Sequence, residues 1–183
     1  MRLSSGCAAL LGALVLGCLG CPAARTVYIP PPGLPALPAT RLVPEPLATV
    51  WTTLETQAGS RGFVLQHHDR AVQLLTLTYT GPLDRYVTCG ELVPEGAFPL
   101  QLHSQIHLLL TAEAATQTRL MTTVEYTLTF AGSLPRVWRK EGSLPLEPIT
   151  FSSGQVGQSL WATPPLICKP TGVLEQEVFA LVP

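Results

Sequence analysis

The sequence predicts an α+β domain of two layers, with an N-terminal helix and a C-terminal helix packed on an antiparallel sheet. Three observations lead to this prediction. An apolar stripe of helical spacing begins near residue 47, alternating strands occupy the middle of the chain, and a second helical stripe follows residue 171. Helices kept apart from a run of strands are typical of α+β folds. Residues 45–183 are an ordinary length for one domain, so we expect a single one.

The domain is expected to open with a helix. Glu45-Pro46 places proline at a first-turn position and an acid near the positive end of the helix. Trp51 lies at the centre of the apolar stripe, so we expect its indole to be buried against the sheet; a surface aromatic that meets a partner is the alternative. Gly59 and Gly62 offer a left-handed stop. The stripe consists of Leu47, Val50, Trp51, Leu54 and Ala58.

Several strands are expected next, because apolar and polar residues alternate with a period of two. The two longest segments are expected to form a hairpin with one buried face. The predicted strands are Phe63–His68, Ala71–Thr80, Arg85–Cys89, Leu100–Ala112 and Thr118–Phe130.

The last third of the domain is richer in proline. Pro135, Pro145 and Pro148 favour irregular structure, with an edge strand over Arg136–Lys140 at most. Apolar residues then return to helical spacing, which predicts a closing helix over Thr171–Leu181.

The N-terminus has the pattern of a secretory signal, predicted over residues 1–17. Arg2 supplies a positive charge, and ten apolar residues follow, too few to span a bilayer of ~30 Å hydrocarbon. Small residues then precede Cys18, and again Cys21. This arrangement resembles the lipobox of bacterial lipoproteins, which implies cleavage before the cysteine and its acylation. An ordinary secretory signal is the alternative.

Two cysteines compete for the lipid. Cys18 is favoured by Val15, because lipoboxes carry Leu, Val or Ile three places before the cysteine. Lipidation at Cys21 would leave Cys89 and Cys168 as an even pair in the mature chain, with no further thiol. Neither is followed by aspartate, the inner-membrane retention signal of such lipoproteins. The resemblance therefore implies a lipid-anchored protein at the outer membrane, with its domain facing the periplasm.

Residues 18–44 are predicted to be a proline-rich tether. Proline occupies eight of the 25 positions from 22 to 46, which excludes helix and sheet interiors. A polyproline-like spacer extends ~3.1 Å per residue, so roughly 20 residues hold the domain about 60 Å from the bilayer. The alternative is a tail that docks along a partner, since a preordered segment loses little entropy on binding.

Composition excludes some partners. The net charge of the chain is −1, charged residues make up only 13%, and there is no basic cluster. Nucleic acid therefore has no electrostatic footprint to bind. We expect the acyl chains to hold the protein at its membrane.

Cys89 and Cys168 are predicted to form a disulfide, as suits a secreted chain. They are separated by 79 residues, and closing a loop of that size contributes on the order of 4 kcal/mol. Two separate buried thiols are the alternative.

Neither a metal site nor catalysis is expected. His103 and His107 have the HxxxH spacing of a helical metal site, but the leucines around them predict a strand, in which they lie about 13 Å apart. His67 and His68 point to opposite faces. There is no GxSxG or SxxK motif, and Glu175 and Glu177 are expected on a solvated helix face. We therefore expect no cofactor and no enzyme.

Several short motifs occur along the domain. They are Val50-Trp51 with Leu54, Gly62-Phe63, Asp69-Arg70, Tyr86–Gly90 and Cys168–Glu175. Together they resemble motifs of the BamC-like bacterial outer-membrane lipoproteins and of related lipoproteins of uncharacterised role. The resemblance implies a helix-grip fold, like that of the TATA-box-binding protein, with helices on a curved sheet, and a part in outer-membrane assembly or envelope scaffolding. BamC has two such domains where this chain has one, and Pro170 replaces an expected serine.

The leading functional hypothesis is a non-enzymatic interaction module, an accessory subunit of an outer-membrane complex. The alternative is a carrier that shelters a lipid or other apolar ligand between sheet and helix. A large cavity would favour the carrier and a filled core the scaffold. The residues expected to line that cavity are Leu75, Leu77, Leu108, Val124, Tyr126 and Val178.

Overall fold

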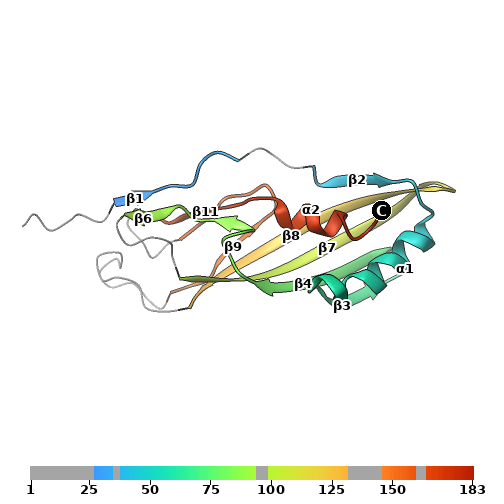
Figure 1. Cartoon of the computed structure of the whole chain (residues 1–183), viewed down its shortest axis with the longest axis horizontal. Coiled ribbons are helices and arrows are strands. Elements are labelled where there is room, and N and C mark those ends of the chain that lie inside the picture. The colour runs from blue at the N-terminus through green and yellow to red at the C-terminus, as the bar shows by residue number, and fades with distance from the viewer. Residues whose placement is uncertain (1–26, 35–37, 94–98, 132–145, 160–163) are drawn as a thin grey trace, which may run out of the picture.

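The computed structural model describes residues 27–34, 38–93, 99–131, 146–159 and 164–183. It is an α+β protein with two α-helices, and every strand pair among these residues is antiparallel, as the sequence predicted (Figure 1). No helix in the described ranges is long and apolar enough to cross a membrane.

The main sheet has six strands in the order β2-β8-β7-β4-β3, with β9 also paired to β8. Its centre is the predicted hairpin, in which residue 110 of β7 faces residue 120 of β8. From Leu100 to Leu110 in β7 and from Thr118 to Leu128 in β8, even-numbered residues are buried and odd-numbered ones face outward, which is the alternation seen in the sequence. The strands are β2 Thr40–Val43, β3 Val64–Asp69, β4 Leu74–Gly81, β7 Leu100–Ala114, β8 Gln117–Phe130 and β9 Ile149–Ser152.

Helix α1, Leu47–Gln57, lies on the buried face of β7 and β8. Four of the predicted stripe residues are buried, namely Val50, Trp51 and Leu54 in the helix and Ala58 just after it, and Trp51 is 4% exposed. A short 3-10 helix, η1 Gly59–Arg61, follows, and Gly62 ends it at a φ of 83°. That left-handed conformation is one glycine adopts readily.

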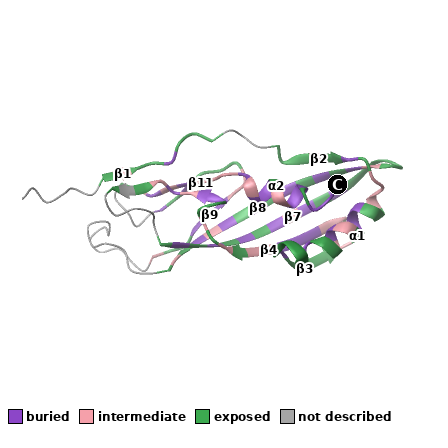
Figure 2. Cartoon of the chain, viewed as in Figure 1, coloured by how far each residue is buried: buried purple, intermediate pink, exposed green. Residues whose placement is uncertain are grey.

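Helix α2, Val173–Phe179, packs on β8 and is shorter at both ends than predicted. Gly172 precedes it at a φ of 77°, so the helix begins after the threonine with which the prediction began. Leu174 and Val178 are buried in the core. Figure 2 shows buried positions along α2 and along the long strands of the sheet.

Short strands complete the other end of the molecule. β10 Gly157–Gln158, β11 Ile167–Pro170 and β5 Val87–Thr88 form one small sheet, and β1 Val27–Ile29 pairs with β6 Glu91–Val93. β5 was predicted from the sequence, whereas β6, β9, β10 and β11 were not. The predicted edge strand Arg136–Lys140 lies outside the described residues.

The predicted tether differs most from the structure. Two parts of residues 18–44 are strands of the folded body, β1 and β2, so the predicted domain boundary at residue 45 is too late. Neither strand contains a proline, so both can form backbone hydrogen bonds with a neighbouring strand. Both lie at sheet edges, where the prolines beside them remove no hydrogen bond from the sheet interior. Residues 27–43, apart from the undescribed 35–37, form what we call the N-terminal strap. In Figure 1 the strap runs from β1 at one end of the molecule to β2.

Candidate interaction site at the disulfide end

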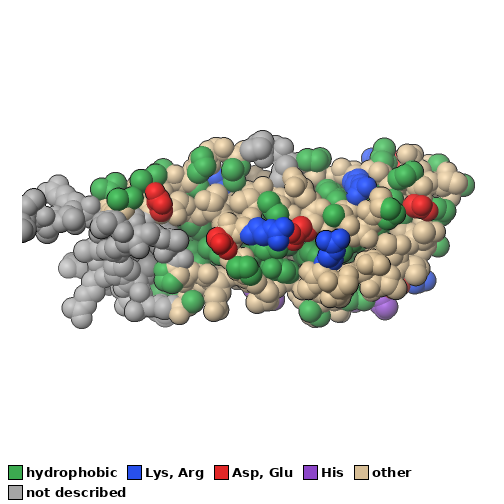
Figure 3. Space-filling view, viewed as in Figure 1, with side chains coloured by type: hydrophobic (Ala, Val, Ile, Leu, Met, Phe, Trp, Pro, Cys, Tyr) green, Lys and Arg blue, Asp and Glu red, His purple; other side chains and the backbone are tan. Residues whose placement is uncertain are grey.

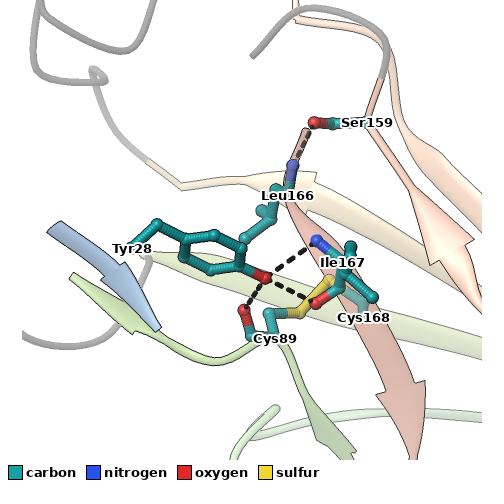
Figure 4. Close-up of a disulfide and its surroundings, with 6 residues drawn as sticks. All are labelled: Tyr28, Cys89, Ser159, Leu166, Ile167 and Cys168. Carbon is teal, nitrogen blue, oxygen red and sulfur yellow. Dashed lines mark hydrogen bonds between the residues drawn. A yellow bond between two sulfur atoms is a disulfide. The ribbon is translucent and has the colours of Figure 1, made fainter. Parts of the chain in front are cut away.

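The structure contains the Cys89–Cys168 disulfide, which joins the residue after β5 to the middle of β11 (Figure 4). β11 leads within five residues to helix α2. The bond therefore holds the C-terminal helix close to the β5 strand, in a region where the strands are too short for long ladders of hydrogen bonds.

Tyr28 of β1 attaches the strap to this disulfide. Its hydroxyl oxygen accepts a hydrogen bond from the backbone N–H of Ile167 at 2.9 Å. The same hydroxyl lies 3.0 Å from the carbonyl of Cys89 and 3.1 Å from that of Ile167, and donates its proton to one of them (Figure 4). Burial raises the pKa of Tyr28, so the phenol stays protonated and able to donate.

Two further features fit the strap closely to the body. Lys169 on β11 directs its ammonium at the carbonyls of Pro31 and Pro32, 3.5 and 3.3 Å away. Gly90, at a φ of 72°, faces the carbonyl of Ile29, and any larger side chain there would overlap that oxygen. The left-handed glycine and the missing side chain both let β1 approach.

Arg41 fixes the other end of the strap. Its guanidinium donates to the carbonyls of Phe179, Val182 and Pro183 at 2.6, 3.1 and 3.0 Å. These carbonyls end helix α2 and the chain, where a cation is favourable. The backbone of Ala39 also accepts a hydrogen bond from Thr122 of β8 at 2.8 Å. The strap is thus held at both ends by specific contacts.

A cleft of about 330 Å³ lies between the strap and the body. Gly33 and Leu34 of the strap form one wall, and Lys169 and Glu175 contribute from β11 and α2. The turn after β9 supplies Ser153, Gly154, Gln155 and Val156, and the lining is completed by Pro38, Ala39, Pro170 and Gly172. The cleft therefore combines an ammonium and a carboxylate with mostly apolar walls.

Glu175 was predicted to be solvated, and this was wrong: its side chain is only 5% exposed. Oε1 accepts hydrogen bonds from Tyr126 Oη at 2.9 Å and Ser153 Oγ at 2.8 Å. Oε2 has no hydrogen-bond partner in the described part of the chain. Burial, and then the Glu175 carboxylate, raise the pKa of Tyr126. A position in the first turn of α2 favours the acid here.

Glu177 behaves differently, although it lies only two residues further on. It forms an ion pair with Arg85 and accepts a hydrogen bond from Tyr86 Oη at 2.8 Å. Burial, followed by contacts with Tyr79 and with this carboxylate, raises the pKa of Tyr86. Glu177 therefore joins α2 to the segment before β5 and is not a freely solvated acid.

The residues expected to line a carrier cavity are all fully buried in the core. None of the six lines the cleft, which lies on the strap side. The six are Leu75, Leu77, Leu108, Val124, Tyr126 and Val178.

The histidines lie on strands. His103 and His107 of β7 each pair with a threonine of β4, at 3.1 Å from Thr80 Oγ1 and 3.3 Å from Thr76 Oγ1. Within the described ranges, no three His, Cys, Asp or Glu side chains are grouped as metal ligands.

Two predicted residues cannot be located in the structure, and two residues of the site were not predicted from the sequence. Cys18 and Cys21 lie outside the described residues, so lipidation stays a prediction. Tyr28 and Glu175 were missed because their partners are distant in sequence and no local spacing marks them. No protein-family model, curated protein or solved structure matches this chain.

Proposed function

We propose that this chain is a lipid-anchored interaction module of the bacterial outer membrane, an accessory subunit of an envelope complex. Acyl chains at Cys18, or at Cys21, would hold it, and its domain would face the periplasm. The proposal involves no catalysis, cofactor or metal.

The observation that supports an interaction module over a ligand carrier is the filled core. A carrier needs an apolar cavity of several hundred Å³ around its ligand. The side chains between sheet and helices instead pack against each other, with the centre of the sheet fully buried. The disulfide supports export to an oxidising compartment. The lipobox-like sequence and the BamC-like motifs support the membrane address and the envelope role.

Intact mass of the protein extracted from native membranes tests the lipid. We expect a species heavier than the cleaved chain by its acyl groups, which high salt does not release, because acyl tethering is insensitive to screening. A single unmodified species released by salt would contradict the anchor.

Crosslinking in native membranes, followed by affinity purification and mass spectrometry, tests the interaction role. We expect an outer-membrane protein to be recovered at constant ratio to this chain. Recovery of a bound lipid with no protein partner would instead favour the carrier.

A further inference from the structure

We propose that the β1–β6 ribbon is a membrane-contact face, seated on the surface of the bilayer that holds the acyl chains. This inference rests on the proposed lipid anchor. It differs from the expected 60 Å spacer, because the strap is folded onto the domain and leaves little chain free.

The length of chain before the strap sets the distance. From Cys18 to Val27 there are nine residues, and from Cys21 only six. At no more than ~3.6 Å per residue these reach about 30 Å or 20 Å. Because β1 is paired with β6 and Tyr28 is bound beside the disulfide, the body cannot move further away unless the strap detaches.

The ribbon presents apolar side chains outward. Val27 faces Val93 directly across the ribbon, and Ile29 lies two residues along the same face. Their side chains are 56%, 42% and 46% exposed, while Tyr28 points the other way, toward the disulfide. Figure 3 shows hydrophobic side chains over the end of the molecule that carries β1. Glu91, opposite Ile29, lies at the edge of this same face and is the one charged residue of the ribbon in the described residues.

An apolar face held within 20 to 30 Å of acyl chains fits the interfacial region of a bilayer, where valine and isoleucine enter the headgroup boundary. No cluster of Lys or Arg accompanies it, so the contact is apolar and not electrostatic. The opposite end of the molecule points away: the β7 strand of 15 residues is about 50 Å long.

The test places the photocrosslinking residue benzoylphenylalanine at Val93 and, as the matched control, at Val72. Val72 is 59% exposed and lies in the turn before Leu74, which pairs with Leu109. Leu109 is nine residues along β7 from the disulfide end, about 30 Å. The acylated full-length chain is reconstituted into vesicles of phosphatidylethanolamine and phosphatidylglycerol and irradiated. We expect several-fold more phospholipid adducts at Val93 than at Val72, unchanged by high salt.

A second substitution guards against a folding artefact. Val27→Asp in the chain probed at Val93 should reduce lipid adducts several-fold, whereas Val72→Asp in the same chain should not. A circular dichroism spectrum and a urea midpoint like those of the wild type confirm folding in every variant. Equal labelling at Val93 and Val72 in acylated protein would overturn the membrane-contact face and leave the anchor standing. If the protein proved not to be acylated, both the lipid anchor and the membrane-contact face would be overturned.

Discussion

At the α1 end, long strands and a helix bury leucine, valine and tryptophan side chains in one continuous layer. At the disulfide end, the strands have two to four residues, and a disulfide, the Tyr28 hydroxyl and charged side chains hold them together. The first region is stabilised mainly by apolar burial, which any well-matched side chains supply. The second depends on individual bonds, so each of its residues is harder to replace. This contrast predicts how variants in the two regions will behave.

The largest effect is expected at the α1 end. Trp51→Ala should lower the free energy of unfolding by ~3–5 kcal/mol, because it leaves a cavity under the helix. Urea unfolding of the isolated domain measures this, and adding reductant should shift wild type and variant alike. Leu42→Ala, at a position half exposed on β2, is the control and should stay within about 0.5 kcal/mol.

An unchanged midpoint for Trp51→Ala would mean that burial of the indole does not stabilise the domain. If that variant also lost a partner recovered with wild type, α1 would have to be reinterpreted as a binding element.

At the disulfide end, Cys168→Ser should lower stability by ~2–5 kcal/mol. The double variant Cys89→Ser/Cys168→Ser should unfold at the same urea concentration as the single one, because the bond is lost only once. Wild type in reductant should match both. Alkylation of both cysteines in untreated periplasmic protein would show that the bond is absent.

The same contrast explains what the sequence could predict. The α1 helix and the hairpin were predicted closely because their apolar residues repeat over eleven or more positions. β5 was predicted within the longer segment Arg85–Cys89, whereas no alternation of apolar and polar residues marks β10 or β11. The fold class was therefore confirmed, while the architecture of the disulfide end was mostly not foreseen.

The strap shows a second limit. Its prolines correctly exclude a sheet interior, but they say nothing about edges, and β2 lies at an edge of the main sheet. The contacts of Arg41 and Tyr28 span more than 130 residues of sequence, so no local pattern reveals them. Glu175 was misassigned for the same reason, since Tyr126 and Ser153 are its partners only after folding.

A smaller effect is expected from Tyr28→Phe. A hydrogen bond contributes about 1 kcal/mol net, and this change leaves the Ile167 N–H without its acceptor. We expect faster amide hydrogen exchange in β1 and β6, with little change in the urea midpoint of the main sheet. Val27→Ala, on the outward face of the same strand, is the control. If exchange quickened equally across the hairpin, the strap would be part of the cooperative core.

The smallest effect concerns Glu55 of α1, which contacts His68 and Arg70 at 2.9 Å. Burial raises its pKa, but the contacts with His68 and Arg70 outweigh this and hold the pKa below its ordinary value. A lowered folded pKa stabilises the protein above the ordinary value, near 4.3, and that contribution disappears as pH falls through the folded pKa.

Glu55→Gln should therefore lower stability by less than ~1 kcal/mol near neutral pH, since the partners are exposed. At about pH 3 the gap from wild type should narrow. Urea midpoints at both pH values, with and without added salt, measure this; Glu125→Gln, exposed on β8, is the control. A gap that widened in acid would show that the pKa is raised. The α1 end would then tolerate a charge only at a cost, which would sharpen the contrast with the disulfide end, where charged contacts of Lys169 and Glu177 help to hold the structure together.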